Sequence, residues 1–407
     1  MSNILIRNFG PVKKGYSDNQ GWMDIKKVTV FIGNQGSGKS AIAKLISTLS
    51  WIEKALVRGS LKESEILKKG YLENQCRYQN IYEYFKPDSY IEYDGEAIQF
   101  KYERGASTVK FKKTKAYFLP KIMYVPAERN FISAVRNVTS LKGLPGTLYT
   151  FSDEYIKATE DLKGNLDLPI NNVKFEYQKL NQLSSIVGQD YKIRLSNASS
   201  GFQSLVPLYL VTKYLAERIG NSDSISGATE DISLEDESKI RKEVDAILSN
   251  PRLTDAVKQA SLERLSSRYR YSSFLNIVEE PEQNLFPTSQ QQILNSLLYF
   301  NNLNPRNGLV ITTHSPYLIN YLTLAVKAGN LKNKIKQRDL NELNEIVPLQ
   351  STIATEDLVI YQLEENEGTV AVLETYKGIP SDENKLNEEL GESNELYARL
   401  LEIQQGV

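Results

Sequence analysis

The octapeptide GNQGSGKS at residues 33–40 fits the pattern GxxxxGK[ST], which brings a glycine-rich loop, a lysine and a hydroxyl to one phosphate chain. The glycines let the backbone curl so that its N–H groups point at the phosphates. Lys39 adds a positive charge, and the Ser40 hydroxyl is a ligand for Mg²⁺. Magnesium-bound ATP is the ligand that this combination predicts. The candidate ATP-binding residues are Gly33, Asn34, Gln35, Gly36, Ser37, Gly38, Lys39 and Ser40.

The segments beside the octapeptide are those that would hold such a loop in place. KVTVFI at 27–32 predicts a short buried strand, and AIAKLISTLS at 41–50 predicts a helix with its apolar residues on one face. An ordinary glycine-rich turn is the alternative interpretation of the motif. Because the strand, loop and helix follow one another in the required order, the sequence favours nucleotide binding.

Two carboxylates follow a second apolar run. In VEEPE at 278–282, Glu279 and Glu280 come directly after the predicted strand that begins near Phe274. Ligands of parallel α/β sheets bind at the carboxyl ends of the strands, so both side chains are expected at the nucleotide. Glu279 is the candidate Mg²⁺ ligand and Glu280 the candidate general base for the attacking water. A solvated acidic turn is the alternative interpretation.

His314 is the single histidine of the chain and ends the predicted strand GLVITTHS at 308–315. A lone histidine is more often structural than catalytic. Its place at a strand end, one helix after the glutamate pair, puts it on the same rim of the sheet. We therefore expect His314 to donate a hydrogen bond to the γ-phosphate and count it, with Glu280, as a candidate catalytic residue.

The bulk composition is that of a globular protein, since 41% of the residues are hydrophobic and 24% are charged. The net charge of −1 creates no global attraction to nucleic acid or to an anionic membrane. Local contact with nucleic acid is left open by two basic stretches, for which a solvated face is the alternative. Without signal-peptide features or a long apolar stretch, the protein is expected to be cytoplasmic and free of membrane contact. The basic residues are Lys110, Lys112, Lys113, Lys115, Lys332, Lys334, Lys336 and Arg338.

The order of predicted elements indicates an α/β protein that forms a single domain over 1–407. ILIRNFG at 4–10 and KVTVFI predict a strand pair that leads into the loop. Three segments are predicted within the domain: a helical and β-hairpin insertion at 51–120, a charged helical insertion at 221–270, and a strand pair with a final helix at 340–407.

The ordered set GNQGSGKS, SSGFQS, VEEPEQNLFP and TTHSPYL resembles ABC-type ATPase heads, and more narrowly the bacterial ATPases related to SMC, Rad50 and OLD proteins. The resemblance implies ATP hydrolysis by an α/β head with a mostly parallel P-loop sheet, an antiparallel β subsheet and helical insertions. It also implies a site that two copies share in a homodimer or larger homo-oligomer. SSGFQ at 199–203 resembles the signature that contacts ATP on a second subunit, so Ser200, Gly201 and Gln203 are further candidate ATP contacts.

The chain departs from the ABC pattern at several positions. Glu279 stands where an aspartate is usual, and Phe202 stands where the signature has its second glycine. YVPAERN at 124–130 takes roughly the place of the Q-loop. There, Glu128 and Arg129 either approach the site or form a structural ion pair. These departures weaken the analogy with transporter subunits.

Three functions are compatible with this resemblance. The ATPases of two-gene anti-phage systems fit best, PARIS-type first and Septu-type second. They imply a sensor or scaffold switch that controls an effector nuclease from a neighbouring gene and answers to a phage-encoded trigger. A Rad50-like or SMC-like DNA-repair or DNA-binding ATPase is the alternative, although no long heptad arms lie between the loop and SSGFQ. A transporter ATPase subunit is the third.

Overall fold

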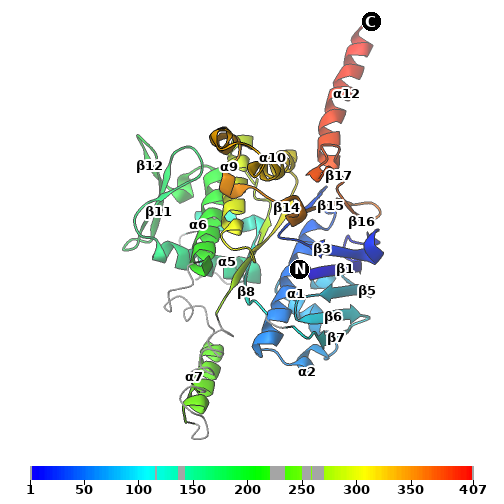
Figure 1. Cartoon of the computed structure of the whole chain (residues 1–407), viewed down its shortest axis with the longest axis vertical. Helices are drawn as coiled ribbons and strands as arrows, with labels where there is room; N and C mark the ends of the chain where they lie inside the picture. Colours follow the sequence, from blue (N-terminus) through cyan, green and yellow to red (C-terminus); the bar gives the residue numbers. More distant parts are fainter. Residues whose placement is uncertain are drawn as a thin grey trace.

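The computed structural model describes residues 2–114, 117–135, 143–220, 234–249, 258 and 270–405. Its centre is a seven-stranded sheet, which Figure 1 shows running through the body. In sheet order the strands are β2 (Gly15–Tyr16), β16 (Thr369–Val372), β15 (Leu358–Glu364), β4 (Val28–Gly33), β14 (Gly308–Thr313), β13 (Ser273–Glu279) and β8 (Pro120–Val125). The five strands from β15 to β8 are parallel, which confirms the predicted α/β fold with a mostly parallel sheet.

Strand β4 occupies the middle of this sheet because its side chains are apolar on both faces. All six of its residues are buried. Val30 and Ile32 belong to one apolar cluster, whereas Phe31 belongs to a second cluster on the opposite face. A strand buried on both faces needs a cover of helices on each side, as in other parallel sheets.

Helices cover the two faces of the sheet as this pattern requires. The Phe31 face packs on α1 (Lys39–Arg58), and the Val30 face packs on α6, α9 and α10. Burial of each apolar side chain in these layers stabilises the fold by roughly 1.5–3 kcal/mol. The covering helices of the second face are α6 (Ser200–Gly220), α9 (Pro287–Asn302) and α10 (Pro316–Lys332).

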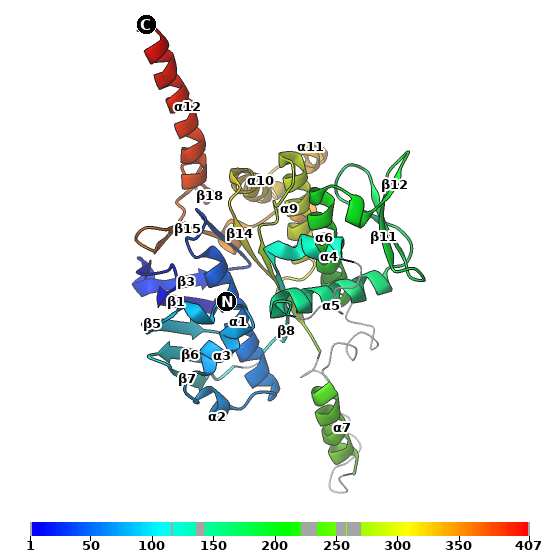
Figure 2. The same cartoon turned by 180° about the vertical axis from the view of Figure 1, so that it is seen from behind.

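An antiparallel sheet of five strands lies beyond α1, with the strand order β3-β1-β5-β6-β7 (Figure 2). The predicted pairing of residues 4–10 with 27–32 is wrong, because β1 pairs with β3 and β5 while β4 pairs with β14 and β15. The physical reason is the complete burial of β4, which only the central sheet provides. The strands are β1 (Ser2–Phe9), β3 (Trp22–Ile25), β5 (Phe85–Asp94), β6 (Ile98–Glu103) and β7 (Ala106–Phe111).

A third, small antiparallel sheet packs beside α5 and was not predicted. Its strands are β9 (Leu166–Asp167), β10 (Lys174–Gln178), β11 (Leu183–Val187) and β12 (Lys192–Arg194). The remaining helices are α2 (Glu63–Ile66), α3 (Tyr71–Arg77), α4 (Asn130–Ala134), α5 (Gly146–Asp161), α7 (Leu234–Ser249), α11 (Leu340–Ile346) and α12 (Lys385–Gln405). Short 3₁₀ turns include η3 (Ala127–Arg129) and η5 (Leu195–Asn197). Strands β17 (Thr375–Tyr376) and β18 (Ile379–Pro380) pair to form a two-stranded antiparallel ribbon.

The three predicted segments differ in how they join the body. Segment 51–120 contains the end of α1, then α2 and α3, and then the β5–β6–β7 meander that completes the antiparallel sheet. In 340–407 the predicted strand pair forms as β15 and β16, and β15 enters the central sheet beside β4. Helix α12 then projects away from the body (Figures 1 and 2). Of 221–270 the structure describes α7 and little else, and the rest of that segment lies outside the described residues, as does Lys115.

Candidate active site

The octapeptide forms a curled loop between β4 and α1, closed by its own lysine. Gly33, Gly36 and Gly38 have φ values of 143°, 74° and 105°, a backbone region that side chains other than glycine rarely adopt. A Cβ atom on Gly33 would lie 2.5 Å from the carbonyl oxygen of Leu363 on β15. The Nζ atom of Lys39 donates to the carbonyl oxygens of Gly33 and Asn34, each at 2.8 Å. The loop is therefore wrapped around a buried cation.

The middle of this loop faces solvent while its ends are packed. Asn34, Gln35 and Gly36 are exposed, and a Cβ at Gly36 would meet no atom within 4 Å. Ser37 is buried, and its hydroxyl has no hydrogen-bond partner within the described part of the chain. Helix α1 begins at Lys39, so its N-terminal dipole points into the loop. An open curl of N–H groups with a helix N-terminus and a cation behind it fits a phosphate chain.

Lys39, His314 and Glu280 contact one another in that order at the carboxyl edge of the central sheet, with His314 in the middle. The Nδ1 atom of His314 is 3.5 Å from Lys39 Nζ, and its Nε2 atom is 3.5 Å from Glu280 Oε1. Burial, followed by the charge of Lys39, lowers the pKa of His314. A neutral imidazole that accepts from Lys39 at Nδ1 carries its proton on Nε2, where it can donate to the Glu280 carboxylate or to a phosphate oxygen.

Glu280 sits just beyond β13 in a strained backbone conformation. Its φ is 43°, in the left-handed region that costs a residue other than glycine roughly 1–3 kcal/mol. Its N–H donates to the carbonyl oxygen of Thr312 at 2.9 Å, which fixes it to the end of β14. Burial, then the neighbouring Glu279, raises the pKa of Glu280. A carboxylate with a raised pKa is a stronger base, so this environment suits proton abstraction from water.

Glu279 is buried at the end of β13, with 5% of its surface exposed. Its Oε2 atom accepts a hydrogen bond of 3.2 Å from the N–H of Ala127, at the start of η3. This bond aims one carboxylate oxygen at η3. Mg²⁺ at a triphosphate takes one or two protein ligands and completes its shell with phosphate oxygens and water. Glu279 and the half-buried Ser40 hydroxyl would be those ligands, and the assignment stays a prediction.

Two glutamates that the sequence analysis missed hold the site residues in position. Glu282 Oε1 accepts from the Thr313 hydroxyl at 2.7 Å and from the N–H of His314 at 2.8 Å. Glu365, which follows β15, accepts from Asn34 Nδ2 at 3.1 Å and from Lys385 Nζ at 2.8 Å. Lys385 first, and Asn34 second, lower the pKa of Glu365 to about 2. Two sequence signals could have identified these residues. Glu282 is the third acid of VEEPE, and Glu365 directly follows a predicted buried strand.

The segment resembling the ABC signature lies apart from the loop. Ser200 is exposed at the first residue of α6, and Gly201 is buried against the turn that follows Glu280. The Nε2 atom of Gln203 donates to the carbonyl oxygens of Ser196 and Ala198, both at 3.0 Å, so it caps the turn before its own helix. Among the described residues, no hydrogen bond joins 199–203 to 33–40. One chain therefore brings together the loop, Glu280 and His314, but not Ser200.

Of the two residues considered in YVPAERN, only one contacts the site. Glu128 is exposed to solvent. Arg129 is fully buried and donates to the carbonyl oxygens of both Glu279 and Glu280, each at 2.7 Å. The sequence left open whether these residues approach the site or form a structural ion pair. In the structure, the Arg129 side chain holds the backbone of the two glutamates.

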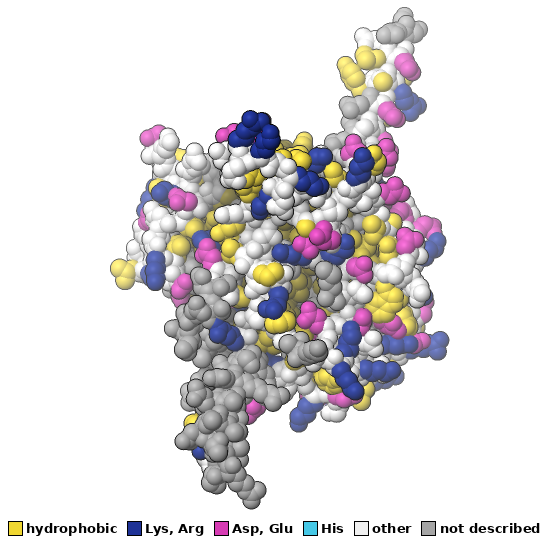
Figure 3. Space-filling model, viewed as in Figure 1, with side chains coloured by type: hydrophobic (Ala, Val, Ile, Leu, Met, Phe, Trp, Pro, Cys, Tyr) yellow, Lys and Arg dark blue, Asp and Glu magenta, His cyan; other side chains and the backbone are white. Residues whose placement is uncertain are grey.

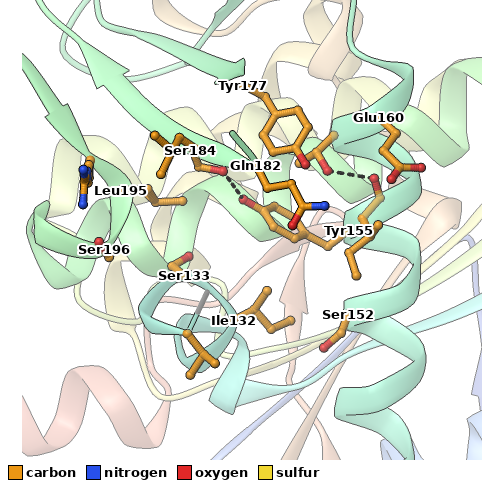
Figure 4. Close-up of a pocket in the computed structure, with 15 residues that line it drawn as sticks. Ile132, Ser133, Ser152, Tyr155, Glu160, Tyr177, Gln182, Ser184, Leu195 and Ser196 are labelled. Atoms are coloured by element: carbon orange, nitrogen blue, oxygen red, sulfur yellow. Dashed lines mark hydrogen bonds between the residues drawn. The ribbon is translucent and has the colours of Figure 1, made fainter. Parts of the chain in front are cut away.

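A separate cavity of about 390 Å³ lies between α4, α5 and the β10–β11 hairpin (Figure 4). Ser133, Tyr155, Ser184 and Ser196 point into it, and the Tyr155 hydroxyl is 3.5 Å from the Ser184 hydroxyl. Its lining carries little charge, with one carboxylate and one guanidinium group. A triphosphate needs several cations or N–H donors, so the loop at 33–40 remains the better candidate for ATP.

Among known proteins, similarity to this chain is found with solved structures alone. No model of a known protein family matches the sequence, and none of the curated proteins does. Among solved structures, the chain is similar to the SMC head domain from Thermotoga maritima, with 11% identity, a TM-score of 0.36 and coverage of 92% of this chain and 98% of that one. It is also similar to an ATP-binding cassette, MJ0796, solved as a dimer with ADP and phosphate, with 13% identity, a TM-score of 0.28 and coverage of 92% and 100%.

A third similar structure is the Smc head domain with an extended coiled coil bound to the C-terminal domain of ScpA, derived from Pyrococcus furiosus. It shares 10% identity at a TM-score of 0.32, covering 98% of this chain and 100% of that one. Identities and TM-scores at this level are low. The fold assignment therefore depends on the strand order, the loop and the helix layers described above.

If the loop at 33–40 binds ATP as predicted, we expect the charge of Lys39 to make the ATP affinity depend on pH. Burial lowers the pKa of Lys39 to about 8, against the opposing effect of nearby glutamates, Glu280 first. A bound triphosphate stabilises the ammonium form, so binding takes up a proton near this pH. Affinity should be constant well below pH 8 and fall by up to about tenfold per pH unit above it. Calorimetry in two buffers of different ionisation enthalpy measures the uptake, and equal heats in both would contradict it.

Proposed function

We propose that the protein is an ABC-type ATPase in which two copies complete each other's ATP sites. One copy supplies the loop, Glu280 and His314, and the other supplies Ser200 and Gly201. The observation that carries this proposal is the contact series Lys39–His314–Glu280 at the carboxyl edge of the sheet, with contacts of 3.5 Å on each side of the histidine. Ser200, exposed at a helix N-terminus and apart from that contact series, is available to a second copy.

The residues of this contact series would divide the work of hydrolysis. Glu280 would take a proton from the attacking water, helped by its raised pKa. His314 would hold Glu280 through Nε2–H and then donate to the γ-phosphate oxygens as their charge grows. Lys39 would neutralise the bound phosphates, and Ser40 and Glu279 would hold Mg²⁺, which would supply further positive charge to the phosphate groups.

We further propose that ATP turnover works as a switch for a separate effector nuclease in anti-phage defence. The order of the four motifs, which resembles that of the ATPases of two-gene anti-phage systems, supports this role. AriA, the PARIS ATPase, is the first candidate and PtuA-type Septu ATPases are the second, and no single motif separates the two. A projecting helix gives such a switch a surface for contact. Among the side chains described on α12, Leu396, Leu400 and Ile403 are exposed and spaced for one helix face. A phage-encoded trigger would act on the ATP-bound assembly.

A DNA-binding ATPase of the Rad50 or SMC kind is the second candidate, favoured by the basic stretch at the end of α10. Lys332, Lys334, Lys336 and Arg338 are all exposed, and Figure 3 shows Lys and Arg side chains gathered where α10 and α11 lie. Each basic stretch is partly neutralised, because Arg338 pairs with Asp339 at 3.3 Å and Lys112 pairs with Asp94 at 2.8 Å. Salt-dependent DNA binding that Lys334→Glu abolishes would favour this candidate.

The shared site is tested by replacing Ser200 with arginine. The bulky cation should prevent closure of the second copy onto ATP, so turnover falls at least about tenfold and ATP-dependent dimerisation is lost. Affinity for ATP in the monomer should change by less than about twofold, because the loop is untouched. Phosphate release, light scattering with a slowly hydrolysed ATP analogue, and calorimetry measure the three quantities.

The matched control for this test is Ser64→Arg, at an exposed serine on α2. It adds the same side chain far from the proposed interface and should leave all three quantities unchanged. A Ser200→Arg protein that hydrolyses ATP at the normal rate as a monomer would exclude the shared site.

The effector role is tested by the product of the neighbouring gene. A TOPRIM-type nuclease that is encoded there and co-purifies with this protein supports a PARIS-type system, and an HNH nuclease supports a Septu-type system. Membrane permeases support a role in transport.

A further inference from the structure

We propose that Arg129 is a positioning residue that couples the two ATP sites of a dimer to each other. Within one chain it joins the backbone of Glu280, which serves that chain's own site, to α6, whose first residues serve the partner's site. The inference rests on the proposed function, since it presumes sites shared between two copies.

Arg129 is bound entirely by backbone carbonyl groups from three elements. Its Nη1 atom donates to Glu279 O at 2.7 Å and Pro126 O at 3.2 Å, and its Nη2 atom donates to Glu280 O at 2.7 Å. The Nε atom donates to Ser204 O, near the start of α6, at 3.1 Å. The guanidinium is a rigid planar fork, so its donors move as one body. The ends of β8 and β13 and the start of α6 are thereby fixed to a single group.

The charge of Arg129 is kept despite complete burial. The side chain is 0% exposed. Burial lowers its pKa to about 10, while the charges of Glu282 and Glu280, followed by Glu279 and Glu128, act in the opposite direction. The group therefore stays protonated at neutral pH. A buried cation held by carbonyl oxygens is costly to leave unpaired, so its contacts resist separation.

A second connection joins the same two elements. Asn284, in the turn after Glu280, donates from Nδ2 to the Ser204 hydroxyl at 3.2 Å. A Cβ on Gly201 would lie 2.8 Å from the Asn284 carbonyl oxygen, so the backbone of α6 touches this turn directly. The first turn of α6 cannot shift without moving the turn that carries Glu280.

Two-fold symmetry turns this contact within one chain into a link between sites. In the proposed dimer, the Ser200 end of α6 contacts the ATP held by the partner, while Glu280 acts on the ATP held by its own chain. When α6 closes onto the partner's ATP, its movement would be transmitted through Arg129 to the backbone of Glu280. This would position the Glu280 carboxylate for hydrolysis of the ATP bound by its own chain. Hydrolysis should therefore be positively cooperative, with a Hill coefficient approaching 2, the limit for two sites.

Arg129→Lys tests the coupling because the charge remains while the fork is lost. One ammonium group cannot hold all the carbonyl groups at their present positions, so the Hill coefficient should fall toward 1 and maximal turnover should fall with it. The affinity of the monomer for ATP should stay within about twofold. Arg58→Lys, at another buried arginine on α1, is the matched control and should keep the cooperativity of the unmodified protein.

Ser204→Ala provides a milder variant, since it removes only the hydroxyl that accepts from Asn284. It should lower the Hill coefficient partially without loss of folding, and it decides the question if Arg129→Lys does not fold. A folded Arg129→Lys protein, or failing that Ser204→Ala, with unchanged cooperativity would overturn the coupling while leaving the shared site intact. A non-cooperative unmodified dimer would overturn it as well. Full activity of the monomer would instead overturn the proposed function.

Discussion

ATP binding is expected to be lost when Lys39 is replaced by alanine, with affinity weakened at least about a hundredfold. The substitution removes the positive charge inside the loop and the two hydrogen bonds of 2.8 Å that close it. Hydrogen bonds to charged groups are each worth about 1.5–3 kcal/mol, and two such contacts to phosphate correspond to this loss. Calorimetry or a fluorescent nucleotide measures the affinity.

Lys68→Ala is the matched control for this change, because Lys68 is exposed and lies outside the site. It removes the same side chain and should leave affinity unchanged. Thermal unfolding of both variants, without nucleotide, separates loss of binding from loss of folding. Undiminished affinity in a folded Lys39→Ala protein would remove nucleotide binding by this loop, and with it the proposed function.

Glu280→Gln is expected to keep ATP binding while turnover falls by about a hundredfold or more. Glutamine has the size of glutamate and can keep the contact with His314, but it cannot take a proton from water. Bound ATP should therefore persist and hold two copies together. Phosphate release measures the turnover, and light scattering in the presence of ATP measures the trapped dimer or larger assembly.

The control for Glu280→Gln is Glu63→Gln on α2, an exposed carboxylate away from the sheet edge. Unchanged turnover in Glu280→Gln would assign the base to another residue. Loss of ATP binding in the same protein would point instead to a role of the carboxylate in forming the site. The two outcomes are distinguished by the calorimetric titration used for Lys39.

The parts of the site that the sequence predicted are those with a local pattern. The loop, the apolar strands before Glu279 and His314, and the helix that starts near Ser200 each depend on residues close in the chain, and all of these elements form. The rule that parallel strands end at one edge then brings Glu280 and His314 together. Local sequence pattern and sheet geometry together were therefore enough to predict where Glu280 and His314 lie.

The residues that sequence reasoning missed depend on partners far along the chain. Glu365, at the end of β15, contacts Asn34, and no local sequence pattern near either residue predicts this contact. Arg129 was ambiguous because its acceptors are backbone carbonyl groups, which have no sequence signature. The pairing of β1 with β5 was also not predicted, because burial in the folded protein, rather than order along the chain, decides which strands pair.

The position of β15 beside β4 is expected to set when the proposed nucleotide site can form during synthesis. The loop emerges early, yet one edge of β4 is covered only by residues 358–364 and the other by residues 308–313. At ribosomal rates of about 5–20 residues per second, the loop waits on the order of tens of seconds for β15. A nascent chain is therefore expected to stay incapable of binding ATP through most of its translation, so that no copy can commit to an assembly before its sheet is whole.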